Sequence, residues 1–248
     1  MKGFLKYLFI QFKMELRDKG TLLNFYLVPL IFFLCMGSVF SSINPFMKKY
    51  LAASMTIFAI TMGAVMGAPV PIIQMRETGT LRAFKVNGIP GIAVLSVHAV
   101  STFLHLLLVS VIIYIVSPLA YGSEVPKNQL LYFVVLIVFL AVNIGIGLLI
   151  GAAAKGQSFA HMFSMMIFLP SLLLSGIMFP VSMLPKSFLW LGRIFPATHA
   201  LQSFYGLAYK TKTDINAVLS LSVLIVMAVM MFLLAVLRFS SIRKNEQM

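Results

Sequence analysis

The sequence predicts an all-α polytopic membrane protein with six transmembrane helices. Six long apolar stretches, nearly free of charge, fill most of the 248 residues. A bilayer core about 30 Å thick requires roughly 20 apolar residues for one helical crossing. Hydrophobic residues make up 60% of the chain and charged residues only 10%, whereas soluble domains carry about 25% charged residues. This composition excludes an ordinary soluble globular fold.

The excess of basic over acidic residues is explained by contact with the membrane. The net charge is +13, and the 19 Lys and Arg residues lie mostly at the ends of the apolar stretches. At those places they contact anionic lipid head groups and set the orientation of helices. No basic face with interleaved aromatic residues occurs elsewhere. We therefore expect membrane lipids as partners and no nucleic acid.

Residues 1–20 precede the first crossing and are predicted to form an interfacial amphipathic helix. Their apolar residues recur at helical spacing: Phe4, Leu5, Leu8, Phe9, Phe12 and Leu16. Basic residues lie mostly on the other faces: Lys2, Lys6, Lys13 and Arg17. A helix of this kind lies along the membrane surface with its basic side toward lipid phosphates.

The six crossings follow in order, separated by turn residues. The predicted ranges are 22–42, 51–74, 91–117, 130–154, 159–179 and 215–237. Breaks are expected at Asn44-Pro45, at Pro118 with Gly122, and at Lys155–Ser158. An even number of crossings puts both termini on one side of the membrane. Because most of the basic residues then fall on that side, the positive-inside rule predicts that both termini lie in the cytoplasm. We expect the protein in the plasma membrane.

The stretch 180–213, between the fifth and last crossings, is too broken to span a membrane and too apolar to be a free loop. Pro180, Pro185 and Pro196 interrupt it. Its apolar residues are Phe188, Leu189, Trp190, Leu191, Ile194 and Phe195. Irregular backbone at membrane depth must be buried in protein or face water, so we expect a broken re-entrant or surface hairpin on the outer face.

The absence of several catalytic motifs narrows the range of possible functions. The chain has no His-Glu-x-x-His, no Gly-x-Ser-x-Gly and no P-loop, so we expect no enzyme site and no ATPase site of its own. All six acidic residues fall outside the predicted crossings or at their ends: Glu15, Asp18, Glu77, Glu124, Asp214 and Glu246. A proton- or sodium-coupled carrier needs a buried carboxylate. The energy for any transport is therefore expected from another protein.

Three polar residues share one face of the third crossing: His98, Ser101 and His105. They are candidates for lining a translocation path. The alternative, which we favour, is that neutral imidazoles form hydrogen bonds between neighbouring helices. Two histidines seven residues apart do not approach one ion on a straight helix, so no metal site is expected. Small residues at four-residue intervals, such as Gly147 and Gly151, indicate close helix packing.

Two motifs, in this order among six crossings, give the chain a family resemblance. The first is Arg76-Glu77-Thr78-Gly79-Thr80-Leu81, with Pro90 before the third crossing. The second is Leu174-Ser175-Gly176-Ile177-Met178-Phe179-Pro180 with Leu184-Pro185, followed by Pro196-Ala197-Thr198-His199-Ala200-Leu201. The chain resembles an ABC-2 type transporter permease, the membrane subunit of an ATP-binding-cassette exporter, over essentially its whole length.

The resemblance implies one transmembrane domain over residues 1–248. It implies a cytoplasmic coupling loop over 75–90, in which the residues that contact the ATPase are Arg76, Glu77, Gly79, Thr80 and Leu81. It also implies an outer gate with a re-entrant bend at Gly176, Phe179, Pro180, Leu184, Pro185 and Pro196. The stretch Arg82–Gly88 departs from the leucines that are usual in the family.

The resemblance implies a permease that exports a substrate with ATP hydrolysed by a separate ATP-binding-cassette subunit. ATP and Mg²⁺ would bind that subunit, and this chain would bind no cofactor. A second permease chain, identical or different, completes the path. Substrates in the family range over drugs, peptides, lipids, polysaccharides and sodium, and the sequence does not choose among them. The alternative is a non-transporting accessory or immunity protein that scaffolds a complex.

Overall fold

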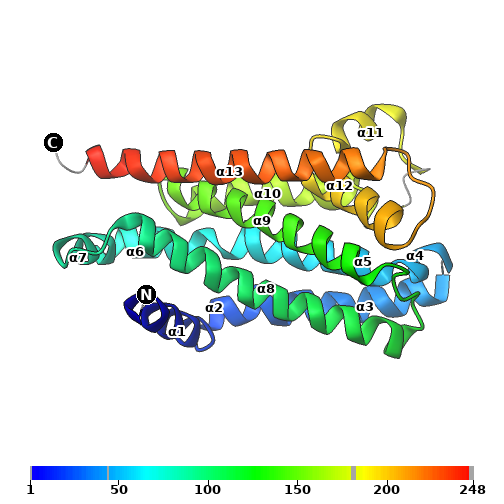
Figure 1. The fold of residues 1–248 in the computed structure, drawn as a ribbon, viewed down its shortest axis with the longest axis horizontal. Coiled ribbons are helices and arrows are strands. Elements are labelled where there is room, and N and C mark those ends of the chain that lie inside the picture. Colours follow the sequence, from blue (N-terminus) through cyan, green and yellow to red (C-terminus); the bar gives the residue numbers. More distant parts are fainter. Residues whose placement is uncertain (1, 44, 180–182, 246–248) are drawn as a thin grey trace.

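The structure is a computed structural model that describes residues 2–43, 45–179 and 183–245. Within these ranges every regular element is a helix. Figure 1 shows an elongated bundle in which the long helices run roughly along its longest axis. Pro180, one of the residues expected at the outer bend, lies outside the described residues.

Six helices in the described ranges are long and apolar enough to cross a membrane. The first span, Lys19–Ile43, joins α2 (Lys19–Leu22), η1 (Leu23–Leu27) and α3 (Val28–Ile43). The second, Leu51–Glu77, joins α5 (Leu51–Thr61), η2 (Met62–Gly67) and α6 (Pro69–Glu77). The others are α8 (Gly91–Tyr121), α9 (Gln129–Ala153), α10 (Gln157–Leu174) and α13 (Ala217–Asn245). These helices confirm the predicted fold class.

The second span and α9 form the centre of the bundle. In the most apolar part of the second span 83% of the residues are buried, against 22% in the first span and in α10 and 11% in α13. The central contact is close because Gly147 has no side chain: a Cβ there would lie 2.1 Å from the carbonyl oxygen of Ala64. The outer helices therefore keep large apolar faces for lipid or for another chain.

Several helix ends differ from the sequence prediction, and two of them lie at predicted proline breaks. The third crossing was expected to stop before Pro118, but α8 continues through Pro118 and ends at Gly122, whose φ is +63°. The fifth crossing was expected to reach residue 179, but α10 ends at Leu174. Gly176 has a φ of +89°, a left-handed conformation that glycine adopts without steric cost and that ends helices. In both cases the glycine, and not the proline, marks the end.

The bundle has two distinct ends (Figure 1). One carries α1 (Lys2–Glu15), α7 (Thr80–Val86) and the end of α13, and we call it the α7 end. The other carries α4 (Pro45–Lys49), α11 (Lys186–Gly192) and α12 (Pro196–Ser203), and we call it the α11 end. At the α11 end Lys49 Nζ lies 2.9 Å from Glu124 Oε2.

Candidate functional site

The short helix α7 is separated from the bundle by a glycine on each side. Its N-cap is Gly79, with a φ of +74°, and Gly88 follows its end with a φ of +76°. The Thr78 hydroxyl donates to the carbonyl of Gln74 at 2.8 Å and lies 2.8 Å from the Thr80 hydroxyl. These hydrogen bonds lie at the end of α6 and the beginning of α7, where the left-handed Gly79 separates the two helices. The sequence thus builds a separate helix where the coupling loop was expected.

Two of the expected coupling residues contact the ends of other spans, and two others belong to α7. Arg76 donates a hydrogen bond to the carbonyl oxygen of Ala154, at the end of α9. Glu77 Oε2 lies 3.5 Å from the amide nitrogen of Gln157, at the start of α10. Glu77 therefore faces the α9–α10 turn and not the N-terminal helix. Thr80 and Leu81 form the first turn of α7, and both are half-buried.

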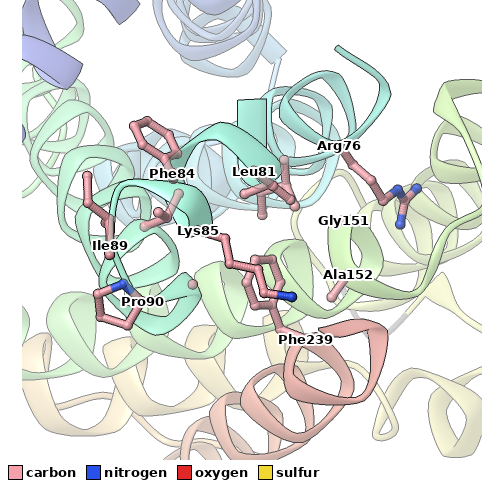
Figure 2. A pocket seen from close by; sticks show the side chains of 13 residues that line it. Arg76, Leu81, Phe84, Lys85, Ile89, Pro90, Gly151, Ala152 and Phe239 are labelled. Carbon is pink, nitrogen blue, oxygen red and sulfur yellow. The ribbon is translucent and has the colours of Figure 1, made fainter. Parts of the chain in front are cut away.

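A cavity of about 260 Å³ lies against α7 (Figure 2). Its walls come from α6, α7, the start of α8, the end of α9 and Phe239 of α13. Most of the lining is apolar, and Arg76 and Lys85 are its charged residues. The loop that the sequence singled out therefore covers a hollow between the ends of four spans.

The α7 end also contains a buried carboxylate. Glu15, the last residue of α1, is 4% exposed and packs against α8. Its carboxylate accepts hydrogen bonds from Gln11 Nε2 at 2.8 Å, from His98 Nδ1 at 3.1 Å and from the Ser101 hydroxyl. His105 Nε2 lies 3.2 Å from Oε2, close enough for an ion pair but poorly aligned for a hydrogen bond. We call these five residues the Glu15 cluster.

In each histidine of the Glu15 cluster, the ring nitrogen that does not face Glu15 contacts another residue. His98 Nε2 lies 2.9 Å from the carbonyl oxygen of Ala68, which can only accept. Nε2 is therefore a donor, and the geometry is that of an imidazolium–carboxylate pair. His105 Nδ1 lies 2.6 Å from the hydroxyl of Tyr26, and its ring stacks on Phe12 with centroids 4.2 Å apart. The cluster thus connects α1 to the first three spans.

The electrostatics of Glu15 follow from these neighbours. Burial alone would raise the pKa of its carboxyl group, because desolvation disfavours the charge. The adjacent His105 and His98 rings, the charge of His98 and the Gln11 amide outweigh that effect and hold the pKa below its ordinary value. Glu15 is therefore an ionised carboxylate inside the protein.

Apart from Pro180, which is outside the described residues, the residues expected at the outer bend lie next to or within α11 and α12, or just after α10. Figure 1 shows α11 and α12 at the α11 end. Gly176 is buried and Phe179 is exposed, Pro185 precedes α11, and Pro196 begins α12. Leu184 is half-buried beside Pro185. The α11 helix meets the end of α10 closely, since a Cβ at Gly192 would lie 2.5 Å from the carbonyl oxygen of Leu174.

The turn from α11 into α12 is fixed by side chains that bind backbone. The Thr198 hydroxyl donates to the carbonyl of Gly192 at 2.6 Å, and His199 Nε2 lies 2.9 Å from the carbonyl oxygen of Arg193. Every residue of α12 is buried. This part of the hairpin is packed into the bundle, and its role as a gate stays a prediction.

A family model described as ABC-2 type transporter matches residues 7–209. This range runs from α1 to the residue after η4 (Phe204–Ala208). The chain belongs to the ABC-2 type transporter family. A similar curated protein is ABC transporter G family member 20 of Dictyostelium discoideum, 27% identical over 165 residues. The aligned part covers 66% of this chain and 22% of that protein, so the chain spans about a fifth of the relative's length.

The sequence did not predict the central residue of the Glu15 cluster in this ABC-2 type transporter. Glu15 was grouped with acidic residues that lie outside the crossings, which is correct for its position in the chain. Its burial was missed because it arises from the packing of α1 on α8. The expectation that the chain has no buried carboxylate, which argued against an ion-coupled carrier, is therefore wrong. A usable signal was present, since three polar residues on one face of an apolar helix require a partner.

In this ABC-2 type transporter chain, the polar face of α8 is buried inside the bundle and is not accessible to solvent. His98, Ser101 and His105 are at most 1% exposed, and they contact Glu15, Tyr26 and Ala68. Contacts between helices were expected, but His98 donates from both ring nitrogens and is therefore a charged imidazolium and not the neutral imidazole that was expected. A path-lining role for the three residues stays a prediction.

Proposed function

We propose that this chain is the permease subunit of an ATP-binding-cassette export system. A separate ATPase subunit would bind ATP and Mg²⁺ and drive export of a substrate across the plasma membrane. The family membership and the name of the Dictyostelium relative support a transporter. The observation that carries the proposal is the exposure of α7, which lies at one end of the bundle. Val86, for example, is 82% exposed.

The contacts of α7 suggest how a push from the ATPase would reach the membrane. The neighbouring segments continue directly into the second span and α8. Arg76 and Glu77 join the base of α7 to the ends of α9 and α10. The Glu15 cluster joins α8 to α1. A displacement of α7 would therefore act on several spans together. In this proposal the α7 end, with both termini, faces the cytoplasm.

A second permease chain, identical or different, would complete the translocation path. The apolar exposed surfaces of the first span and of α10 support this arrangement, because only 22% of the residues in the most apolar part of each are buried. A large exposed apolar face marks either lipid contact or a protein interface. We propose that the first and fifth crossings meet their counterparts in the second chain.

The first test is whether a gene for an ATP-binding-cassette subunit lies beside the gene for this chain, and the second is co-expression of the two proteins. Copurification of the two, with ATPase activity that depends on the permease, is the expected result. Two copies of a permease chain are expected in the active complex. If the chain assembles with other proteins but with no ATPase, the accessory or immunity function is the better explanation.

A further inference from the structure

The cavity against α7 has the two-sided character of a site for an amphiphile. Figure 2 shows the Lys85 side chain running along the ring of Phe239 toward Ala152, with the Arg76 guanidinium on the same side. Ile89 and Pro90 lie on the other side of the cavity. One part of the wall is therefore cationic and the other part is apolar.

The two cations are available to an anion. None of the described residues that line the cavity is acidic. Within the described part of the chain, neither Arg76 nor Lys85 has a carboxylate within ion-pair distance. Arg76 donates to the carbonyl of Ala154, which leaves most of the five guanidinium N–H donors free. A cationic pair with no counter-ion favours a ligand that brings negative charge.

The place of the cavity indicates the source of that ligand. Its walls include the end of α6, the beginning of α8, the end of α9 and Phe239 in the C-terminal part of α13. Four spans thus reach the head-group level of the membrane beside it. Its volume of about 260 Å³ is below the roughly 300–1,000 Å³ of sites for whole drug-sized ligands. It suits a head group and the first part of one chain.

We propose that this cavity binds the acidic head group of a phospholipid from the leaflet at the α7 end. The phosphate would contact Lys85 and Arg76, and the adjoining glycerol and acyl carbons would lie against Phe239 and Phe84. The remaining chain would continue into the bilayer. Such a lipid would join α7 to the ends of α8, α9 and α13. The leaflet is the cytoplasmic one if the proposed orientation holds, but the site itself does not depend on an ATPase.

The experiment uses the full-length chain, delipidated in detergent and titrated with phosphatidylglycerol or phosphatidylcholine. Bound lipid is counted by native mass spectrometry. We expect preferential retention of phosphatidylglycerol. Lys85→Gln should weaken that retention about fivefold, since one basic residue near anionic lipid contributes on the order of 1 kcal/mol. The matched control is Arg82→Gln, which removes an exposed cation from α7 that does not line the cavity.

A second variant separates the site from general surface charge. Ile89→Trp keeps both cations and fills the apolar side of the cavity, and it should also reduce retention. Equal retention by wild type and Lys85→Gln would overturn the proposal, as would equal losses in Lys85→Gln and Arg82→Gln. Displacement of the lipid by inorganic phosphate at matched concentration would mean a soluble-anion site instead. None of these outcomes involves the ATPase, so the proposed export function is tested separately.

Discussion

Acidic residues are usually exposed to solvent, and Glu15 is an exception because it is buried. Carboxylates are almost never fully buried unless they are paired, and this one is paired with His98. Once charges are buried, the loss of one partner leaves the other uncompensated, which costs about 3–5 kcal/mol. A residue on the short N-terminal helix can therefore affect the stability of the whole membrane domain.

We predict that Glu15→Gln lowers the thermal stability of the purified chain substantially, because the charge of His98 loses its partner. The control is Glu124→Gln, which also removes a carboxylate from an ion pair. The Lys49–Glu124 pair is about a third exposed, so its loss is expected to cost at most about 1 kcal/mol. Unfolding temperatures in detergent compare the two variants. Equal effects would mean that the burial of Glu15 does not matter.

The same residue predicts a pH dependence. The pKa of Glu15 is lowered in the folded protein. Its contribution to stability is then fully present above the ordinary pKa of a carboxyl group, and it is lost as the pH falls through the lower folded value. The stability difference between wild type and Glu15→Gln should therefore shrink as the pH falls into the acid range. A difference that grows on acidification would contradict the assignment.

At the scale of elements, α7 depends on the backbone of Gly79. A Cβ at this position would meet nothing within 4 Å, yet its φ of +74° strains any side chain. The left-handed conformation costs about 1–2 kcal/mol for an ordinary residue. A substitution there would redirect α7 without a steric clash elsewhere.

We predict that Gly79→Leu abolishes export while membrane insertion and pairing of permease chains persist, because α7 no longer meets the ATPase correctly. Glu77→Ala should act in the same direction by removing the contact with Gln157. The control is Gly3→Ala in α1, where a Cβ also meets nothing within 4 Å and the backbone is not left-handed. Export and ATPase activity are measured in membranes that contain both subunits. Export at the wild-type rate in both variants would mean that this loop is not the coupling element.

The spans were predictable because length and hydropathy decide them, but some of their ends were not. The sequence predicts breaks at Pro118 and Pro180, but α8 passes through Pro118 and α10 ends at Leu174, before Gly176. Tertiary packing can hold a proline inside a helix, whereas a left-handed glycine ends one. Because α10 already ends at Leu174, we do not expect Pro180→Ala to extend the fifth helix.

The candidate site was only partly predictable for a related reason. The position of the α7 loop follows from the motif at Arg76–Leu81. The partner of His98 and the cavity beside Lys85 depend on how α1, α7 and four spans pack together. No local pattern contains that information.

At the scale of the molecule, the two ends of the bundle should face opposite sides of the membrane. Cys35, the single cysteine of the chain, is first replaced by serine. Lys186→Cys at the α11 end is then expected to react with an impermeant maleimide in intact cells. Lys155→Cys, equally exposed but at the α7 end, should react only after permeabilisation. Labelling of residue 155 in intact cells would reverse the proposed orientation.

The bond between Glu15 and α8 has a consequence for biogenesis. Glu15 is synthesised long before His98, Ser101 and His105, which lie in the third span. During synthesis the carboxylate therefore has water as its partner until that span has entered the membrane. The N-terminal helix can reach its final position only after half of the spans are in place. It is made before the six spans and reaches its final position only after the third of them is in place.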